Sequence, residues 1–200
     1  MLNFEDNEIN KQKTKRNYVG KIITCVTGVV TISLCAITIP FLTPALRRHC
    51  LPYVPATDTQ LKNIIIALKH RKGKVIDLGS GDGRVVLELA RHNYESHGVE
   101  MNPWLVMYSK FAATAEGLHC NTKFYRSNLW KFPLSTYDNI IIFGVEQMMQ
   151  DLENKIVTEC KWNCNVVTCR FPLPNLVPLQ TIGHGTDTVW LYDLNQISKK

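Results

Sequence analysis

The most constraining feature of the sequence is a glycine-rich stretch, KVIDLGSGDGRVV, at residues 74–86. Glycines at alternate positions, 79, 81 and 83, follow directly after a run of β-branched and apolar residues. Glycine permits a positive φ and lets a ligand approach the backbone closely. Arg84 begins a predicted helix, and the first N–H groups of a helix have no partner within it. The pattern therefore predicts a strand, a ligand-binding turn and a helix, as in α/β proteins.

Strand and helix patterns alternate through the rest of the C-terminal part. Thr57 and Gln60 form a predicted capping box for a first helix, whose apolar face carries Leu61, Ile64, Ile65 and Leu68. Predicted strands lie at residues 74–78, 96–100, 122–126, 139–143 and 166–171, and predicted helices at residues 84–91, 103–116 and 146–160. Such alternation is typical of a mostly parallel sheet with helices on both faces. The final stretch, LQTIGHGTDTVWLYDL, predicts two antiparallel strands.

The spacing and charge of the loop favour one kind of nucleotide cofactor. A dinucleotide fingerprint reads GxGxxG, whereas this loop reads GxGxG and has Arg84 in place of the third glycine. Asp77 and Asp82 would repel a pyrophosphate but suit a cationic ligand such as S-adenosylmethionine. Glu100 ends the second strand about twenty residues on, where a carboxylate can hold both ribose hydroxyls. We therefore predict S-adenosylmethionine as the cofactor, with a tight turn that binds no ligand as the alternative.

Several motifs together resemble a known family. DLGSGDGR and GVEMNPW resemble the seven-strand S-adenosylmethionine-dependent methyltransferases. TPALRRHCLPYVPAT, NLWKFPLSTYDNIIIFGVEQMM, CRFPLPN and GTDTVWLYD are similar to stretches of the mitochondrial protein-lysine methyltransferases. The resemblance covers about residues 38 to 194. That small family acts on the c-subunit of ATP synthase and on the adenine nucleotide translocase, and VPAT and FGVEQMM are closer to the c-subunit enzyme.

The resemblance implies a Rossmann-like α/β methyltransferase domain at residues 51–194. It implies that this domain methylates a lysine of a membrane protein, which is the ATP synthase c-subunit or, alternatively, the translocase. It implies that the cofactor contacts Asp77, Gly79, Ser80, Gly81, Gly83, Glu100 and Asn128. Asn128 stands where the family has an acid, and its amide oxygen can accept a hydrogen bond from the adenine amine. Three aromatic residues are candidates for a channel that receives the lysine: Tyr53, Trp104 and Phe143. No general base is assigned.

A second constraining feature precedes the domain. Residues 22–46 contain no charged side chain, and about 20 apolar residues suffice to cross a bilayer. We predict a membrane anchor there, with a buried core helix and a cleaved signal as alternatives. Residues 1–21 are predicted to be a polar, disordered tail and residues 195–200 a C-terminal tail. Basic residues flank both ends of the apolar segment, so charge does not determine its orientation. The resemblance implies the mitochondrial inner membrane, with the domain facing the matrix.

Charge and cysteine content exclude some partners. The net charge of +6 is spread along the chain without a long basic run, which argues against a nucleic-acid partner. The seven cysteines include no CxxC pair, so no metal site is predicted, and reduced thiols are the expected state. Two alternative functions stay open. One is methylation of RNA or a small molecule, and the other is a membrane-tethered module that binds S-adenosylmethionine without chemistry.

Overall fold

The computed structural model describes residues 2–42 and 54–197, and the side chains of residues 18–42 and 54–195. The chain divides into two units, an N-terminal helix and a C-terminal domain.

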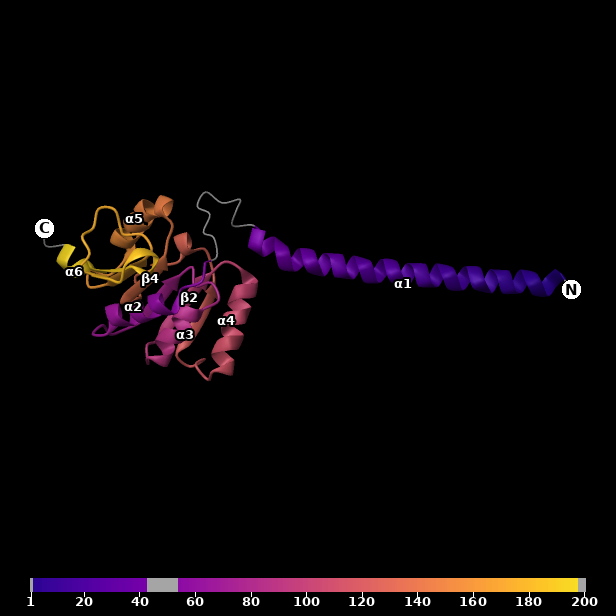
Figure 1. Ribbon diagram of the computed structural model, residues 1–200, viewed down its shortest axis with the longest axis horizontal. Coiled ribbons are helices and arrows are strands. Elements are labelled where there is room, and N and C mark those ends of the chain that lie inside the picture. The colour runs from indigo at the N-terminus through magenta and orange to yellow at the C-terminus, as the bar shows by residue number, and fades with distance from the viewer. Residues whose placement is uncertain (1, 43–53, 198–200) are drawn as a thin grey trace. The chain divides into compact units, whose positions relative to one another are not determined.

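The N-terminal unit is one helix, α1 (Leu2–Leu42), drawn in indigo and violet in Figure 1. The prediction of a disordered tail is therefore wrong for residues 2–21. Neither proline nor glycine occurs between residue 2 and Gly20, so nothing interrupts a helix that extends from the apolar segment. The part long and apolar enough to cross a membrane is Tyr18–Leu42, which starts earlier than predicted. Residues 43–46 of the predicted span lie outside the described residues.

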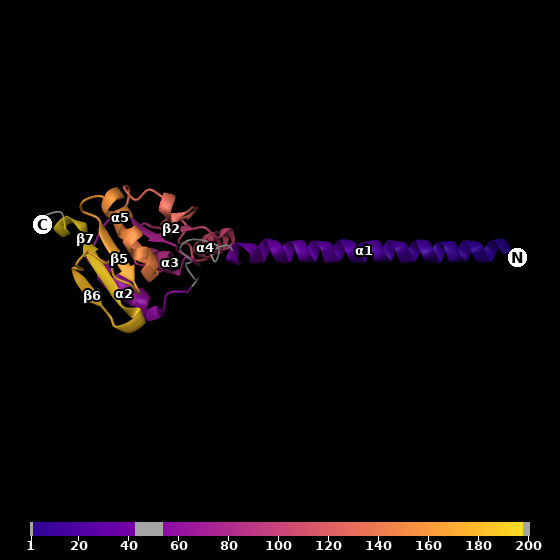
Figure 2. The ribbon, with the colours of Figure 1, turned by 90° about the horizontal axis from the view of Figure 1, so that it is seen from above.

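The domain is built on a seven-stranded sheet with the order β3-β2-β1-β4-β5-β7-β6. The first five strands in this order run parallel, and β7 is antiparallel to both of its neighbours, at the edge labelled in Figure 2. The strands are β1 (Val75–Leu78), β2 (Ser96–Glu100), β3 (Thr122–Arg126), β4 (Asn139–Phe143), β5 (Asn165–Cys169), β6 (Gln180–Ile182) and β7 (Val189–Asp193). The predicted parallel sheet with an antiparallel end is confirmed.

Helices cover both faces of the sheet, as predicted (Figure 1). The α-helices are α2 (Asp58–Leu68), α3 (Arg84–Arg91), α4 (Pro103–Ala115), α5 (Met149–Glu159) and α6 (Leu194–Ile197). Short 3-10 turns are η2 (Leu129–Lys131), η3 (Glu146–Met148) and η4 (Gly185–Asp187). The predicted helix at residues 146–160 is thus η3 followed by α5, and the predicted C-terminal tail begins as α6.

Apolar cores lie on both faces of the sheet because side chains alternate along each strand. Ile140 and Ile142 of β4 pack on the face covered by α5, where Leu152 is fully buried. Ile141, between them, packs on the face covered by α2 and α3, with Ile64 and Leu89. Every residue of β1 and β5 is buried, including the polar Asp77, Asn165 and Thr168, as expected of central strands covered on both faces. These central strands give the loops at their ends a rigid base.

The predicted capping box of α2 is confirmed. The Gln60 amide N donates to Thr57 Oγ1 at 3.1 Å, and the Thr57 amide N donates to Gln60 Oε1 at 3.0 Å. The same two side chains reach the turn before β7. Thr57 Oγ1 donates to Asp187 Oδ1 at 2.7 Å, and Gln60 Nε2 donates to the Thr186 carbonyl at 2.6 Å. The start of α2 is therefore fixed to the antiparallel edge of the sheet.

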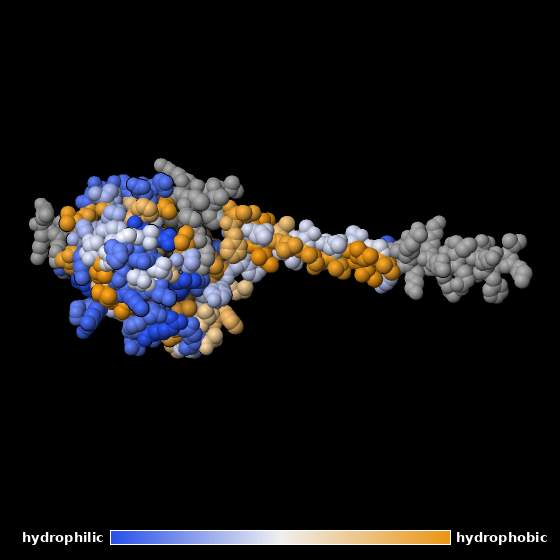
Figure 3. All heavy atoms as spheres, in the orientation of Figure 1, coloured by the Kyte–Doolittle hydropathy of each residue, from blue (hydrophilic) through white to orange (hydrophobic). Residues whose placement is uncertain are grey.

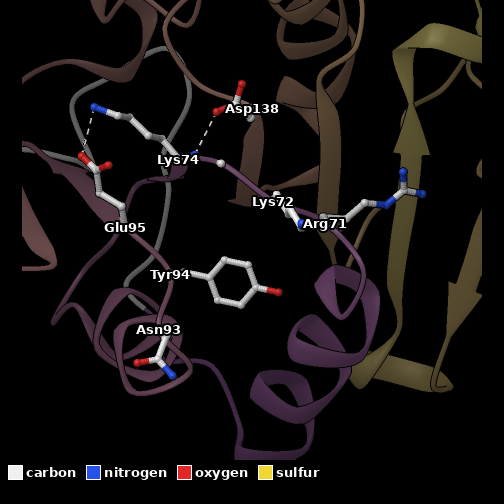
Figure 4. A pocket seen from close by; sticks show the side chains of 8 residues that line it. Arg71, Lys72, Lys74, Asn93, Tyr94, Glu95 and Asp138 are labelled. Carbon is white, nitrogen blue, oxygen red and sulfur yellow. Dashed lines mark hydrogen bonds and ion pairs between the residues drawn. The ribbon is translucent and has the colours of Figure 1, made fainter.

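A polar cavity of about 510 Å³ lies at the amino ends of β1 and β2 (Figure 4). Lys74 Nζ forms an ion pair with Glu95 at 3.0 Å, and the Lys74 amide N donates to Asp138 Oδ2 at 2.9 Å. The lining residues are Arg71, Lys72, Gly73, Lys74, Asn93, Tyr94, Glu95 and Asp138. This cavity is at the edge opposite the glycine-rich loop, so it is not the cofactor site predicted from the sequence. Two more of its charged groups pair outside the lining, Arg71 with Asp193 and Asp138 with Lys161.

Candidate cofactor and active site

The three glycines of the loop after β1 all have positive φ, at 89° for Gly79, 54° for Gly81 and 82° for Gly83. A Cβ on Gly83 would lie 2.7 Å from Ser109 Oγ of α4 and 2.9 Å from the Phe124 ring of β3. A Cβ on Gly79 would meet nothing within 4 Å. Gly83 is therefore required by packing as well as by its backbone angle, whereas the space beside Gly79 is open to a ligand.

Glu100 and the loop come together, although they are on neighbouring strands. Glu100 Oε2 accepts a hydrogen bond from the Gly81 amide N at 3.2 Å, and Oε1 accepts one from the Asn102 amide N at 2.7 Å. The carboxylate is half-buried at the carboxyl end of β2. Loop and acid thus form one site at the carboxyl edge of the sheet, where α/β proteins bind ligands. The ribose contact of Glu100 stays a prediction.

Asp77 is the most perturbed acid of the site. It is 2% exposed, and its Oδ1 has no hydrogen-bond partner among the described residues. Burial, followed by the nearby charges of Glu100 and Asp82, raises the pKa of Asp77 from 3.8 to about 8. A buried carboxylate without a partner is unfavourable unless a positive group binds beside it. The ammonium of S-adenosylmethionine fits this requirement. Ser80 Oγ is also buried and without a partner in the described part of the chain, but it lies against β2, 2.6 Å from where a Cβ on Gly98 would stand, so its cofactor contact stays a prediction.

Asp82, which the sequence suggests as a partner of a cationic ligand, pairs instead with an arginine of the protein. Arg84 Nη2 pairs with Asp82 Oδ2 at 2.7 Å, and Arg84 Nε lies 3.1 Å from Asp82 Oδ1. Arg84 Nη1 also donates to the Ala56 carbonyl at 2.9 Å. The pair therefore fastens the loop to the segment before α2, and the carboxylate of Asp82 is engaged by the guanidinium.

Asn128 follows β3, next to β2 in the sheet. Its Oδ1 accepts a hydrogen bond from the Trp130 amide N at 3.0 Å and so caps η2. An amide oxygen has two lone pairs, so this cap leaves one acceptor position for an adenine amine. The ends of β1, β2 and β3 stand side by side in the sheet, which is the order needed for one extended ligand. The adenine contact stays a prediction.

The three channel candidates have different positions. Trp104 is half-buried in the first turn of α4, and Phe143 ends β4 and packs against the core beneath α2. Tyr53 lies outside the described residues. The NPW stretch at residues 102–104 has a structural use, because Asn102 Oδ1 accepts from the Trp104 amide N at 3.0 Å and Pro103 starts the helix. Phe143 therefore has a packing role, and the channel stays a prediction.

Arg170 is a feature of this edge that the sequence patterns do not single out. It follows β5 with a φ of 74°, a conformation that is uncommon for residues other than glycine. Its Nε is buried, and no atom of the described residues is its hydrogen-bond partner. Strained residues of this kind concentrate at functional sites. Arg170 stands in the CRFPLPN stretch, but a predicted strand over residues 166–171 gives no reason to separate it from an ordinary strand residue.

Comparisons with known proteins agree with this geometry. Residues 77–180 match the model of the ANTKMT methyltransferase domain, and residues 14–47 match that of the N-terminal domain of the ATP synthase C-subunit lysine N-methyltransferase. The ATP synthase C-subunit lysine N-methyltransferase of Xenopus laevis is 50% identical over 94% of this chain and 83% of its own length. The chain belongs to this family of protein-lysine methyltransferases. The Homo sapiens member is 45% identical over 95% of the chain and 79% of its own length.

Two further proteins are informative, one for the family and one for the fold. The adenine nucleotide translocase lysine N-methyltransferase of Mus musculus is 39% identical over 77% of the chain and 69% of its own length. An RNA methyltransferase of Salinibacter ruber, solved with S-adenosyl-L-homocysteine, has a TM-score of 0.67 at 22% identity and covers 70% of this chain and 94% of its own. The latter shows the fold alone. The predicted methyltransferase fold, enzyme class and cofactor are confirmed.

Proposed function

We propose that this chain transfers methyl groups from S-adenosylmethionine to a lysine of the ATP synthase c-subunit. The observation that carries this proposal is the 45–50% identity to enzymes of that name over most of the chain. The adenine nucleotide translocase is the second candidate target, because the matched catalytic-domain model is that of its methyltransferase. The lower identity to that enzyme, 39%, and the match of residues 14–47 favour the c-subunit.

The residues at the carboxyl edge fit the cofactor. Asp77 Oδ1 would pair with the ammonium of S-adenosylmethionine, and the open space beside Gly79 would let the cofactor approach the loop backbone. Glu100 would give up its hydrogen bond from the Gly81 amide and accept hydrogen bonds from the ribose hydroxyls instead. Asn128 would contact the adenine. When bound, S-adenosylmethionine supplies a methyl group already activated by a sulfonium. The protein therefore contributes mainly orientation and the exclusion of water.

The acceptor lysine must be neutral to attack, although its free pKa is about 10.4. An apolar channel lowers that pKa because desolvation disfavours the ammonium. The lysine would lose its proton to solvent beforehand, so that its neutral nitrogen could accept the methyl group that the sulfonium of S-adenosylmethionine would release. No side chain needs to act as a general base. Aromatic faces, with Trp104 as the described candidate, would stabilise the methylated ammonium that forms.

We place the enzyme in the mitochondrial inner membrane, with its domain in the matrix and Tyr18–Leu42 as the anchor. A helix of 25 residues is long enough to cross a bilayer with some tilt. A tether in the same membrane as the target raises the effective concentration to about the millimolar range. The support for this location is the length of the apolar helix together with the names of the relatives, whose target belongs to ATP synthase.

A labelling experiment tests the reaction and the class of target together. Purified full-length enzyme is incubated with methyl-labelled S-adenosylmethionine and mitochondrial membranes, and the label is resolved into protein, RNA and lipid. We expect label in a small membrane protein with the mass of the c-subunit. Gly81→Val is the matched control, because Gly81 has a positive φ and its amide contacts Glu100, so a branched side chain there would distort the cofactor loop. Label in RNA or lipid, or equal label with Gly81→Val, would contradict the proposal.

A further inference from the structure

Helix α4 has an apolar side that the domain does not cover. Met107, Tyr108 and Phe111 are exposed by 57%, 57% and 73%, and their spacing places them on one side of the helix. Figure 3 shows apolar atoms gathered where α4 lies. We call these three residues the outer face of α4. Single exposed apolar side chains are ordinary, but a contiguous group of large ones marks a surface that binds something.

The opposite side of α4 is already occupied. Val106, Ser109 and Ala113 are buried against α3 and β3, where Val86 and Phe124 lie. The helix is thus apolar on both sides, and Lys110 is its one charged residue. A helix with large apolar side chains on two sides normally buries both of them. By contrast, the exposed side of α5 is mainly polar, with Gln150, Asp151, Asn154 and Thr158.

The tether limits what can cover this face. Eleven residues, 43–53, join the last residue of the candidate span to the first described residue of the domain. Such a segment reaches at most about 40 Å when fully extended. If Tyr18–Leu42 crosses a bilayer, the first described residue of the domain is therefore held within about 40 Å of the membrane surface. Aromatic side chains with a neighbouring lysine, as in Tyr108, Lys110 and Phe111, are typical of helices that lie in the lipid interface.

We propose that the outer face of α4 docks on the lipid surface and holds the site against the membrane. The inference rests on the anchor in the proposed function. It explains how a bilayer-embedded target can be reached. Asn102 caps α4, and its backbone N–H donates a hydrogen bond to Glu100 Oε1 at 2.7 Å. The helix and the cofactor edge are therefore rigidly linked. An α4 lying in the interface brings the carboxyl edge of the sheet to the level of a short loop at the membrane surface.

Photo-crosslinking from the outer face tests this docking directly. Benzoylphenylalanine replaces Phe111 in the full-length chain, which is reconstituted into phosphatidylcholine vesicles containing a minority of phosphatidylglycerol and a tagged phosphatidylcholine. The matched control carries the same probe at Trp162, which is 68% exposed in the turn after α5. We expect a lipid adduct at position 111 at least about tenfold above that at position 162.

The other outcomes are equally informative. An adduct of position 111 with a second copy of the chain, or a lipid yield no higher than at position 162, overturns the docking. Flotation of the vesicles shows whether a low lipid yield at position 111 comes from a lack of docking or from a failure of the anchor. A chain that does not float with vesicles contradicts the anchor and the docking with it. A chain that floats but gives no lipid adduct at 111 contradicts the docking alone.

A second variant keeps the inference testable through activity. Combined replacement of Met107 and Phe111 by serine removes apolar surface that the folded domain does not use. We expect unchanged methylation of a detergent-solubilised target and a loss of severalfold on the same target in vesicles. Val157→Ser, at an exposed position of α5, is the control and should change neither rate. Equal rates for the serine variant and the wild type in vesicles would refute the docking.

Discussion

Replacement of Asp77 by asparagine should make the domain more resistant to alkaline pH while abolishing its affinity for the cofactor. Asp77 is buried and its pKa is about 8 in the folded state, against 3.8 when unfolded. Between these values the folded protein keeps a proton that the unfolded chain has lost, so stability falls as pH rises. The fall is about 1.4 kcal/mol per pH unit. Asparagine cannot ionise and has no such dependence.

The assay compares urea unfolding of the wild-type and Asp77→Asn domains at a series of pH values. Subtracting the unfolding free energy of one protein from that of the other removes the contribution of every titrating group that the substitution leaves undisturbed. The free-energy difference in favour of the variant should increase by about 4 kcal/mol from pH 5 to pH 8 and then stay constant. Glu100→Gln removes the second cause of the raised pKa and should move the start of the plateau to lower pH.

A difference that is flat from pH 5 to pH 9 would refute the reasoning, because it would mean that Asp77 ionises with an ordinary pKa. Ligand provides a second check. A bound ammonium favours the carboxylate, so saturating S-adenosylmethionine should weaken the pH dependence in the wild type. Calorimetry should show that binding releases a proton near pH 7, and uptake of a proton would contradict the assignment.

Three further perturbations test other parts of the site. Glu100→Ala should weaken S-adenosylmethionine binding by about tenfold to a hundredfold, because a hydrogen bond to a charged group contributes about 1.5–3 kcal/mol. Calorimetry measures the change, and a loss of affinity below about twofold would mean that the acid faces solvent. Gly83→Ala should lower the unfolding free energy more than Gly79→Ala, because only the former brings a Cβ within 2.7 Å of Ser109 Oγ; equal losses in urea would contradict the packing role. A chain starting at Leu51 should bind cofactor like the whole protein but methylate membrane targets more slowly than detergent-extracted ones. Equal loss in both settings would show that the N-terminal helix is part of the domain.

Most of the fold was predictable because its signals are local. Three strands have the predicted bounds, and Thr57 and Gln60 cap α2 as a local motif requires. The helical state of residues 2–21 is not evident from the sequence, because polarity alone favours disorder. A charged segment without proline or glycine can continue a helix that begins in the adjacent apolar residues.

The contact between the loop and Glu100 was predictable, whereas the cofactor contacts of these residues stay predictions. The loop glycines and Glu100 are recognisable from spacing, and the structure brings them within hydrogen-bond distance. The pairing of Asp82 with Arg84, and the Nε of Arg170 without a partner among the described residues, depend on how side chains pack in three dimensions. The outer face of α4 was equally hidden, because Met107 and Phe111 look like core residues until the helix is placed on the sheet.

The choice of target is tested most directly by competition between two purified proteins. The unmethylated ATP synthase c-subunit and unmethylated adenine nucleotide translocase are reconstituted together with the full-length enzyme and S-adenosylmethionine, and the intact mass of each target is measured over time. We predict that the c-subunit gains whole methyl groups on one lysine before the translocase changes, and that neither changes with Glu100→Ala at low cofactor concentration. Faster methylation of the translocase, or no methylation of either target by an enzyme that binds S-adenosylmethionine, would contradict the proposed function.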